Sequence, residues 1–293
     1  MGKTGWIVYN GNLYTKKFSE QVEWLLYSAK QLNIEMEAIA NHDLLVMTDQ
    51  TGPTLLTDKQ APDFVFFWDK DLFLARQLEH QGIRLFNSAR TIEICDDKAL
   101  THVELASHGV PMPRTIIAPK VYVKLEDDRH LQKVMETIRF PMIIKEAFGS
   151  FGEQVYYIEN EEVLRKKVRE LGNTPYIFQE YLPSSYGKDI RLHVVGDRVV
   201  ASMLRKSDDD FRANVTAGGQ MFPYQPTKEE EALAIKTSQL VGADFAGVDL
   251  LFGPKQEPIV CEINSNAHFK NIYDCTGIDI TKDMLSYIKE QLS

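Results

Sequence analysis

Residues 245–264 read FAGVDLLFGPKQEPIVCEIN: two apolar runs separated by a turn that contains glycine and proline. This pattern is typical of a β-hairpin. In a regular hairpin with a symmetric turn, Asp249 lies directly opposite Glu262, and Asn264 points to the same side of the sheet. Two opposed carboxylates repel unless a cation lies between them, and oxygen ligands of this kind suit magnesium or manganese. The hairpin therefore predicts a metal site that holds a phosphate; the alternative is a solvated sheet face with acids placed by chance.

A glycine-rich loop at residues 148–153 separates two further predicted strands. Its Gly149, Ser150 and Gly152 can turn backbone N–H groups toward a phosphate. Taken alone, the loop is better explained as a flexible turn. Lys145, however, lies just upstream within an apolar strand, where a lysine is seldom buried without an anionic partner. The lysine and the loop together therefore favour phosphate binding.

Lys98 begins a helix that we predict over residues 96–108, with Asp96 as its cap. It is a further candidate for phosphate binding, and a surface lysine is the alternative. The apolar contexts of Cys95 and Cys261 predict small buried side chains. The histidines have no metal-ligand spacing, and no Gly-x-Ser-x-Gly sequence accompanies them. Neither a histidine metal site nor a nucleophilic triad is therefore expected.

A dense group of cations lies in the second half of the chain: Lys188, Arg191, Arg198, Arg205, Lys206 and Arg212. They either bind an anionic ligand or form a salt-bridged sheet face balanced by the acids among them. A two-residue turn at residues 196–197 predicts a hairpin that places Arg205 opposite Lys188. Arg205 then points away from the face that carries Asp189 and Arg191, unless a bulge intervenes or the ladder ends before Arg205.

The 293-residue chain carries 33 lysines and arginines against 42 aspartates and glutamates, a net charge of −9. Such a surface repels a phosphate backbone, so general nucleic-acid binding is not expected. No apolar run approaches the ~18 residues that a membrane helix needs, and the first residues lack the apolar stretch of a signal peptide. Three scattered cysteines do not make a disulfide framework. We expect a reduced, cytoplasmic protein, with homo-oligomerisation left open.

Strand and helix patterns alternate over about the first 90 residues, which predicts an α/β fold with a parallel sheet. Beyond that region, hairpins and single helices follow one another. The pattern changes near residues 90–97 and again near 182–188. These changes indicate three parts along the chain.

Eight short blocks follow one another over about residues 88–285. They are Asn87-Ser with Asp97-Lys98, Pro141-Met-Ile-Ile-Lys145, the glycine loop 149–153, Gln179-Glu-Tyr-Leu182, Gly187-Lys-Asp-Ile-Arg191, Phe211-Arg-Ala-Asn214, Ala246-Gly-Val-Asp249 and Cys261-Glu-Ile-Asn264. In this order the blocks resemble the ATP-grasp superfamily, and most closely the RimK-type α-L-glutamate ligases. The resemblance implies an ATP-grasp fold, in which two α+β lobes grip ATP after a parallel-sheet preATP-grasp domain. The expected domains are 1–92 (preATP-grasp), 93–183 (central lobe with the glycine loop) and 184–293 (C-terminal lobe with the metal site).

The resemblance also implies ATP and two Mg²⁺ or Mn²⁺ ions as cofactors. The implied ATP-binding set comprises two phosphate-binding lysines, a covering loop, a hinge that contacts adenine and an acid near the ribose: Lys98 and Lys145; Gly149, Ser150 and Gly152; Gln179, Glu180, Tyr181 and Leu182; and Asp189. Arg212 and Asn214 would lie near the phosphates or the acceptor. The implied metal ligands are Asp249, Glu262 and Asn264, and Arg205 would face the site.

The implied activity is ATP-dependent ligation of a carboxylate to an amine. The γ-phosphoryl group would pass to the carboxylate, and the amine would attack the resulting acylphosphate and release phosphate. We expect an amino acid donor, with glutamate favoured, held by Arg191, Arg205 and Arg212, because an acidic protein must supply local arginines to bind a dicarboxylate. The acceptor is a peptide, protein or small-molecule carboxylate. The alternatives are a non-catalytic nucleotide-binding regulatory module and a kinase that stops at a phosphorylated product.

Residues 264–271 read Asn-Ser-Asn-Ala-His-Phe-Lys-Asn, where the glutamate ligases typically have a turn of small residues, proline and glycine. This ending is similar to relatives that attach amino acids to carrier proteins or cofactors. The resemblance therefore implies ligation and leaves the substrates open.

Overall fold

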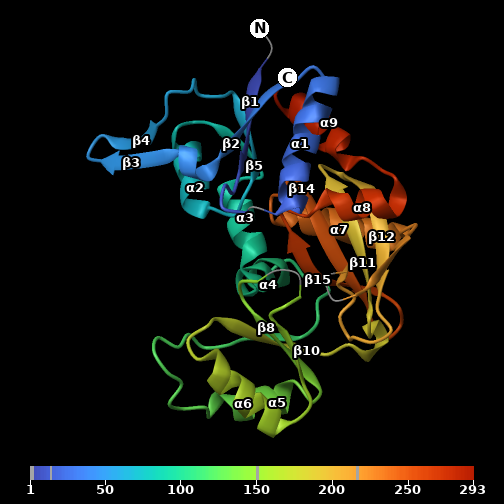
Figure 1. Ribbon diagram of the computed structural model, residues 1–293. Helices are drawn as coiled ribbons and strands as arrows, with labels where there is room; N and C mark the ends of the chain where they lie inside the picture. The colour runs from blue at the N-terminus through green and yellow to red at the C-terminus, as the bar shows by residue number, and fades with distance from the viewer. Residues whose placement is uncertain (1–2, 14, 150–151, 216–217) are drawn as a thin grey trace.

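A computed structural model describes residues 3–13, 15–149, 152–215 and 218–293. Its N-terminal part contains a four-stranded sheet in the order β2-β1-β5-β6, with all neighbours parallel. The strands are β1 (Thr4–Tyr9), β2 (Glu35–Ala40), β5 (Phe64–Trp68) and β6 (Arg84–Phe86), and the helices packed on them are α1 (Lys16–Gln31), α2 (Leu72–His80) and α3 (Ala89–Asp96). The short helix η1 (Asn41–Asp43) leads into a hairpin of β3 (Leu45–Asp49) and β4 (Gly52–Leu56), which projects to one side (Figure 1). The predicted parallel sheet is confirmed.

A second sheet lies at the end of the molecule remote from both termini (Figure 1). Its order is β7-β10-β8-β9, and every neighbouring pair is antiparallel. The strands are β7 (Thr115–Ile117), β8 (Met142–Glu146), β9 (Val155–Ile158) and β10 (Tyr176–Glu180), and helices α5 (His130–Thr137) and α6 (Glu161–Leu171) share their apolar core. The glycine loop therefore connects two paired strands, β8 and β9, as predicted.

The helix predicted over residues 96–108 is wrong at its start. Helix α3 ends at Asp96, and a separate helix, α4 (Lys98–Ala106), begins at Lys98. Asp97 between them is extended, and its carboxylate accepts hydrogen bonds from the backbone N–H groups of Ala99 (2.8 Å) and Leu100 (3.3 Å). Asp97 rather than Asp96 is therefore the cap, because only its side chain reaches the free N–H groups of the first turn.

The third sheet is antiparallel and has the order β13-β12-β11-β14-β15. After the short helix η2 (Pro183–Ser185), its strands are β11 (Lys188–Val195), β12 (Arg198–Lys206), β13 (Gln220–Pro223), β14 (Phe245–Phe252) and β15 (Pro258–Asn264). Helix α7 (Lys228–Leu240) covers one face of the sheet, while α8 (Phe269–Thr276) and α9 (Ile280–Gln291) pack on the other. Among the described residues, no helix has the length and apolar character needed to cross a membrane.

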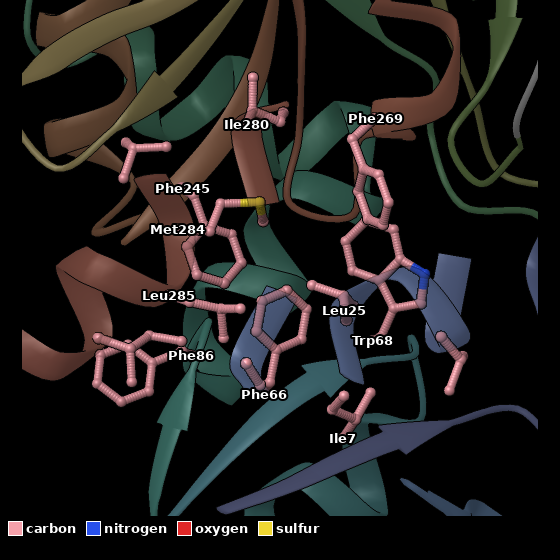
Figure 2. Packing of buried hydrophobic residues seen from close by; sticks show 14 of the residues in the cluster. Ile7, Leu25, Phe66, Trp68, Phe86, Phe245, Phe269, Ile280, Met284 and Leu285 are labelled. Atoms are coloured by element: carbon pink, nitrogen blue, oxygen red, sulfur yellow. The ribbon is translucent and has the colours of Figure 1, made fainter. Parts of the chain in front are cut away.

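One apolar core joins the first sheet to the third (Figure 2). Ile7 and Phe66 come from the parallel strands, whereas Phe245 belongs to β14 and Met284 to α9. The rings of Phe66 and Phe245 stack with centroids 5.0 Å apart. This shared core fixes the ends of the parallel strands against the sheet that carries most of the candidate residues.

Both long hairpins of the third sheet contain a one-residue bulge. In β14–β15, Asp249 pairs with Glu262 as predicted, but Leu250 pairs with Val260, so Cys261 has no counterpart. In β11–β12, the register shifts between His193 and Val194, and residues 188–193, on the side of the shift away from the turn, pair one position later than a regular hairpin would allow.

The bulge in β11–β12 corrects the predicted position of Arg205. Lys188 pairs with Lys206, and Arg205 pairs with Asp189. The predicted pairing of Arg205 with Lys188 is therefore wrong. Of the two exceptions that the sequence left open, the bulge is the one that occurs, and it turns Arg205 to the face that carries Asp189 and Arg191.

Candidate functional site

A cavity of about 660 Å³ lies where the three sheets meet. Its lining includes every described candidate residue: Lys98, Lys145, Gly149, Gly152, Gln179, Glu180, Tyr181, Leu182, Asp189, Arg191, Arg205, Arg212, Asn214, Asp249, Glu262 and Asn264. Ser150 lies outside the described residues. The structure thus brings together side chains that are up to 166 positions apart in the chain. Their individual roles remain predictions.

Acids and arginines form a chain of ion pairs on the floor of this cavity. Arg191 donates two hydrogen bonds to Asp249, from Nε to Oδ1 and from Nη2 to Oδ2, both 2.6 Å long. Arg205 donates to Asp189 through Nε (2.6 Å) and Nη2 (2.9 Å), and Nη2 also reaches Asp249 Oδ2 at 2.8 Å. The register explains the chain, because Asp189, Arg191 and Asp249 share a face of β11 and β14, and Arg205 lies opposite Asp189. Two arginines therefore neutralise two buried acids.

The pKa values of the two acids shift in opposite directions. Burial by itself raises the pKa of Asp249, but Arg191 and Arg205 outweigh it and hold this pKa well below its usual range. The pKa of Asp189 is raised, because burial and the nearby Asp249 charge exceed the effect of Arg205. Asp249 is therefore the carboxylate that stays charged most firmly.

Glu262 and Asn264 complete the predicted metal set. The Asn264 Nδ2 group donates to Glu262 Oε1 at 3.3 Å, and Arg191 Nη2 lies 3.9 Å from the same oxygen. Within the described part of the chain, no group of three or more His, Cys, Asp or Glu side chains is arranged to hold a metal ion. The predicted set is instead two carboxylates and one amide, and these oxygen donors fit Mg²⁺ or Mn²⁺. Asp249, Glu262 and Asn264 are the residues that would hold such an ion.

Lys145 belongs to β8 of the second sheet, and its side chain reaches the hairpin that carries Asp249 and Glu262. It is 7% exposed, and its Nζ donates to the Sγ atom of Cys261 at 3.4 Å. Burial lowers the pKa of Lys145, but Cys261, Glu262 and Asp249 outweigh it and raise the pKa, so the ammonium keeps its charge. Burial raises the pKa of the Cys261 thiol to about 11, which makes it a neutral, weak partner for that charge at pH ~7.

Cys95 and Cys261 are not the core residues that the sequence predicts. Both are only partly buried, and both line the cavity. Cys261 reaches it because the β14–β15 bulge inserts this residue beside Glu262. Lys98, on α4, donates instead to the backbone carbonyl of Gly149 at 3.2 Å. Lys98 therefore bonds to the glycine loop and Lys145 to the bulge residue Cys261, and neither hydrogen bond is to an acid.

Side chains of the predicted hinge form hydrogen bonds with helix α4 and with the start of β7. Gln179 is 2% exposed, and its Nε2 lies 3.1 Å from both His102 Nε2 and Thr115 Oγ1. Burial and the Lys145 charge lower the pKa of His102 to about 4, so its ring is neutral. Glu180 accepts from Nε and Nη2 of Arg114, both at 3.0 Å. These contacts fix the end of β10 where it enters the cavity.

Gly152 of the glycine loop accepts a hydrogen bond from Arg212 and lies close to Asn214. Arg212 Nη1 donates to the Gly152 carbonyl at 2.7 Å, while Nε (3.1 Å) and Nη2 (2.8 Å) bind Asp210. Gly152 has φ +76°, and a Cβ atom there would lie 2.7 Å from Asn214 Oδ1. Glycine is therefore required at this position by both the backbone and the space. Asp189, predicted near the ribose, is engaged with Arg205.

The N-terminal sheet also contributes to the cavity, which the sequence analysis missed. Asn10 and Asp69 follow β1 and β5, and Asn10 Nδ2 lies 3.3 Å from Asp69 Oδ1. Asn266 and His268, after β15, lie on the same side, and Asn266 Nδ2 donates to the Asp69 carbonyl at 2.8 Å. No motif marks these residues. The signal that could have found them is topological, because ligands bind at the carboxyl ends of parallel strands.

Comparisons with known proteins place this geometry in context. A family model described as a RimK-like ATP-grasp domain matches residues 95–288. N-acetylaspartylglutamate synthase A of Homo sapiens is 36% identical over 214 residues, which cover 72% of this chain and 54% of that protein, so the chain spans about half the length of this relative. The glutamate–LysW ligase ArgX of Sulfolobus acidocaldarius is 30% identical over 227 residues, 74% of this chain and 77% of that protein.

A solved structure shows the fold. The ATP-grasp ligase PsnB, complexed with a phosphomimetic variant of its minimal precursor, Mg and ADP, matches with a TM-score of 0.72 over 100% of both chains, at 17% identity. The fold predicted from the ordered sequence blocks is thereby confirmed.

Proposed function

The chain belongs to the RimK-like ATP-grasp family, and from this premise we propose that it is an ATP-dependent acid–amino acid ligase that works through an acylphosphate. The γ-phosphoryl group of ATP is transferred to an oxygen of the acceptor carboxylate, and ADP leaves. The nitrogen of the amino acid then attacks the carbonyl carbon, the C–O bond to phosphate breaks, and the amine loses a proton. The products are an amide, ADP and phosphate.

The observation that carries this proposal is the meeting of charges from two sheets in one cavity. The charged Lys145 comes from the second sheet, and the bonded Asp189–Arg205–Asp249–Arg191 chain belongs to the third. Phosphoryl transfer needs this arrangement, because the protein has little covalent work to do beyond positioning and charge stabilisation.

Each group has a role in this scheme. Lys145 and Lys98 bind phosphate oxygens, and the Gly149–Gly152 loop covers them and excludes water from the acylphosphate. Asp249, Glu262 and Asn264 would hold divalent ions, two in our proposal. Bound magnesium would neutralise phosphate charge and orient the transferred group.

We assign the donor as an α-amino acid, with glutamate favoured. The arginines Arg191, Arg205 and Arg212 line the cavity, and a guanidinium fork matches a carboxylate through two parallel hydrogen bonds. Two relatives, the glutamate–LysW ligase ArgX and N-acetylaspartylglutamate synthase A, have names that are consistent with this choice. The acceptor is a peptide, protein or small-molecule carboxylate.

The test is phosphate release by the purified protein with ATP, Mg²⁺, each standard amino acid and a cell extract as the source of acceptors, followed by mass spectrometry of the products. A ligase releases phosphate only when an amine and an acceptor are both present, and it yields an amide. A regulatory module would bind ATP without release, and a kinase would yield ADP and a phosphorylated product without an amide. Either result would refute the ligase proposal.

The donor is tested separately, by the apparent KM for glutamate in Arg→Lys variants at 191, 205 and 212 with ATP saturating. The variant whose arginine holds the donor carboxylate should raise this KM by roughly ten- to a hundredfold, because it loses a charge-assisted contact, whereas a variant whose arginine has another role should keep it. If glutamate does not support phosphate release, or if all three variants keep its KM, the glutamate assignment is wrong while the ligase proposal stands.

A further inference from the structure

We propose that Arg191 and a divalent cation are alternative partners of Asp249, so that metal binding releases the Arg191 fork to bind an anionic substrate group. This inference rests on the proposed function, since it takes Asp249 as a metal ligand. It adds a coupling between metal and substrate that the ligase assignment does not require.

The Asp249 carboxylate is already bound by Arg191. Both of its oxygens accept hydrogen bonds from Arg191 at 2.6 Å, and Nη2 of the same fork lies 3.9 Å from Glu262 Oε1. The guanidinium thus occupies the space between the two carboxylates that the hairpin sets opposite each other. A Mg²⁺ ion must approach a carboxylate oxygen to about 2.1 Å. The fork and the ion therefore compete for the same side of Asp249.

Two arginines bind Asp249, and one of them must give way to the ion. The Arg205 side chain is 5% exposed and makes three hydrogen bonds to two acids. The Arg191 side chain is 14% exposed and lines the cavity; among the described residues it donates hydrogen bonds to Asp249, and Glu262 lies 3.9 Å away. If Arg191 turns away, Asp249 still keeps its bond to Arg205, whereas movement of Arg205 would break contacts with both Asp189 and Asp249. Arg191 is therefore the mobile partner.

The charges around Asp249 and Glu262 favour the exchange of Arg191 for a divalent ion. Asp189, Arg205, Asp249 and Arg191 neutralise one another pairwise, and Glu262 adds one negative charge that Arg191 approaches only to 3.9 Å and that also raises the pKa of Lys145. A divalent ion at Asp249 and Glu262 replaces the Arg191 charge and leaves the fork without its acid. The released guanidinium then takes a pair of anionic oxygens, from a carboxylate or a phosphate. By linkage, metal and anion must each strengthen the binding of the other.

The central experiment measures Mn²⁺ affinity by electron paramagnetic resonance, with the full chain and no nucleotide. Arg191→Lys keeps the charge but cannot form the fork, so it should bind Mn²⁺ about ten- to a hundredfold more tightly than the parent. Lys188→Gln is the matched control: it removes a cation from the same cavity wall without touching Asp249, and it should change the affinity only a few-fold. Glu262→Gln should abolish the tight binding and so locate the ion.

Thermal unfolding of Arg191→Lys and Arg191→Gln establishes that the variants are folded. If both folded variants bind Mn²⁺ with the parent affinity, the competition is refuted and the ligase proposal is untouched. If the parent binds no Mn²⁺ and yet releases phosphate with Mg²⁺, ATP, an amine and an acceptor, the inference is also refuted. If the parent neither binds Mn²⁺ nor releases phosphate, the metal assignment and the proposed function fail together.

A kinetic arm identifies which anion the released fork takes. In the parent, rising Mg²⁺ should lower the apparent KM of the amino acid if the fork binds its carboxylate, or the KM of ATP if the fork binds phosphate. In Arg191→Lys this dependence should fall at least several-fold. A dependence of equal size in the parent and the variant would contradict the coupling.

Discussion

The charged side chains that line the cavity fall into two groups with different hydrogen-bond partners. On the third sheet, Asp189, Arg191, Arg205 and Asp249 bind one another at 2.6–2.9 Å. The two lysines come from β8 and α4. Lys145 donates a hydrogen bond to a thiol at 3.4 Å, and Lys98 donates to a backbone carbonyl at 3.2 Å. A charge that is already paired holds its position at little net electrostatic gain, whereas a charge with a neutral partner retains most of its attraction for a ligand. We call the first the paired wall and the second the lysine wall.

The largest expected effect is on the paired wall. Glu262→Gln and Asp249→Asn should each lower turnover by about a thousandfold or more, because each removes an anionic metal ligand. Asp249→Asn should in addition lower the free energy of unfolding by ~3 kcal/mol, because it leaves the buried Arg205 and the partly buried Arg191 without full compensation. Steady-state kinetics and chemical unfolding measure the two effects. Equal stability of both variants would show that the ion-pair chain does not support the fold.

The next effect is on the lysine wall. Lys145→Met keeps the volume of the buried stem and removes the charge, so affinity for a non-hydrolysable ATP analogue should fall by roughly ten- to a hundredfold by calorimetry. Lys98→Met is the matched control, with a smaller expected loss because Lys98 is only partly buried and already donates a hydrogen bond to the Gly149 carbonyl. Unchanged nucleotide affinity in Lys145→Met would make this lysine a structural residue.

The two bulges show what the sequence could predict and what it could not. The opposition of Asp249 and Glu262 was predicted from a symmetric turn, but Phe252 pairs with Pro258, one position off that symmetry, and the bulge at Cys261 restores the predicted pair. In β11–β12 the turn was predicted correctly, and the bulge at Val200 displaced Arg205 by one position. Neither bulge contains glycine or another local signal. Register inside a long hairpin is set by packing on both faces of the sheet, which local sequence does not encode.

The same limit applies to the cavity as a whole. The parallel sheet, the two hairpins and the lysine in an apolar strand follow from local patterns and were found. Asn10 and Asp69 were not, because their place in the cavity depends on how the first sheet docks on the third through residues such as Phe66 and Phe245. The sequence indicates such residues only through the order of its strands, because ligands bind at the carboxyl ends of parallel strands.

Each wall also buries one neutral histidine, which predicts a shared dependence on pH. Burial lowers the pKa of His193 to about 3 and that of His102 to about 4, against about 6.5 in the unfolded chain. The unfolded state therefore takes up the proton first, so stability is complete above about pH 6.5 and falls as the pH drops toward the folded pKa. The loss should be about 1 kcal/mol for each histidine between about pH 6.5 and 5.5.

Urea unfolding across this pH range measures the slope. His102→Gln or His193→Gln should each remove its own share of the slope, whereas a substitution at the exposed His80 should not change it. If the parent's stability is flat from about pH 6.5 to 5.5, the two buried rings do not titrate as their burial requires.

The smallest effect expected concerns Arg212, which belongs to neither wall because it bridges the glycine loop and Asp210. Arg212→Lys cannot bond Gly152 and Asp210 together as the fork does, so the loop should close less firmly, and the apparent KM for ATP should rise roughly two- to tenfold. Asp210→Asn is the control, since it keeps the Gly152 bond and loosens only its anchor; its effect should be smaller. The amino acid KM decides the role of this residue. A rise in that KM with an unchanged KM for ATP would place Arg212 at the donor carboxylate instead of the loop, and the exclusion of water from the acylphosphate would then not depend on Arg212.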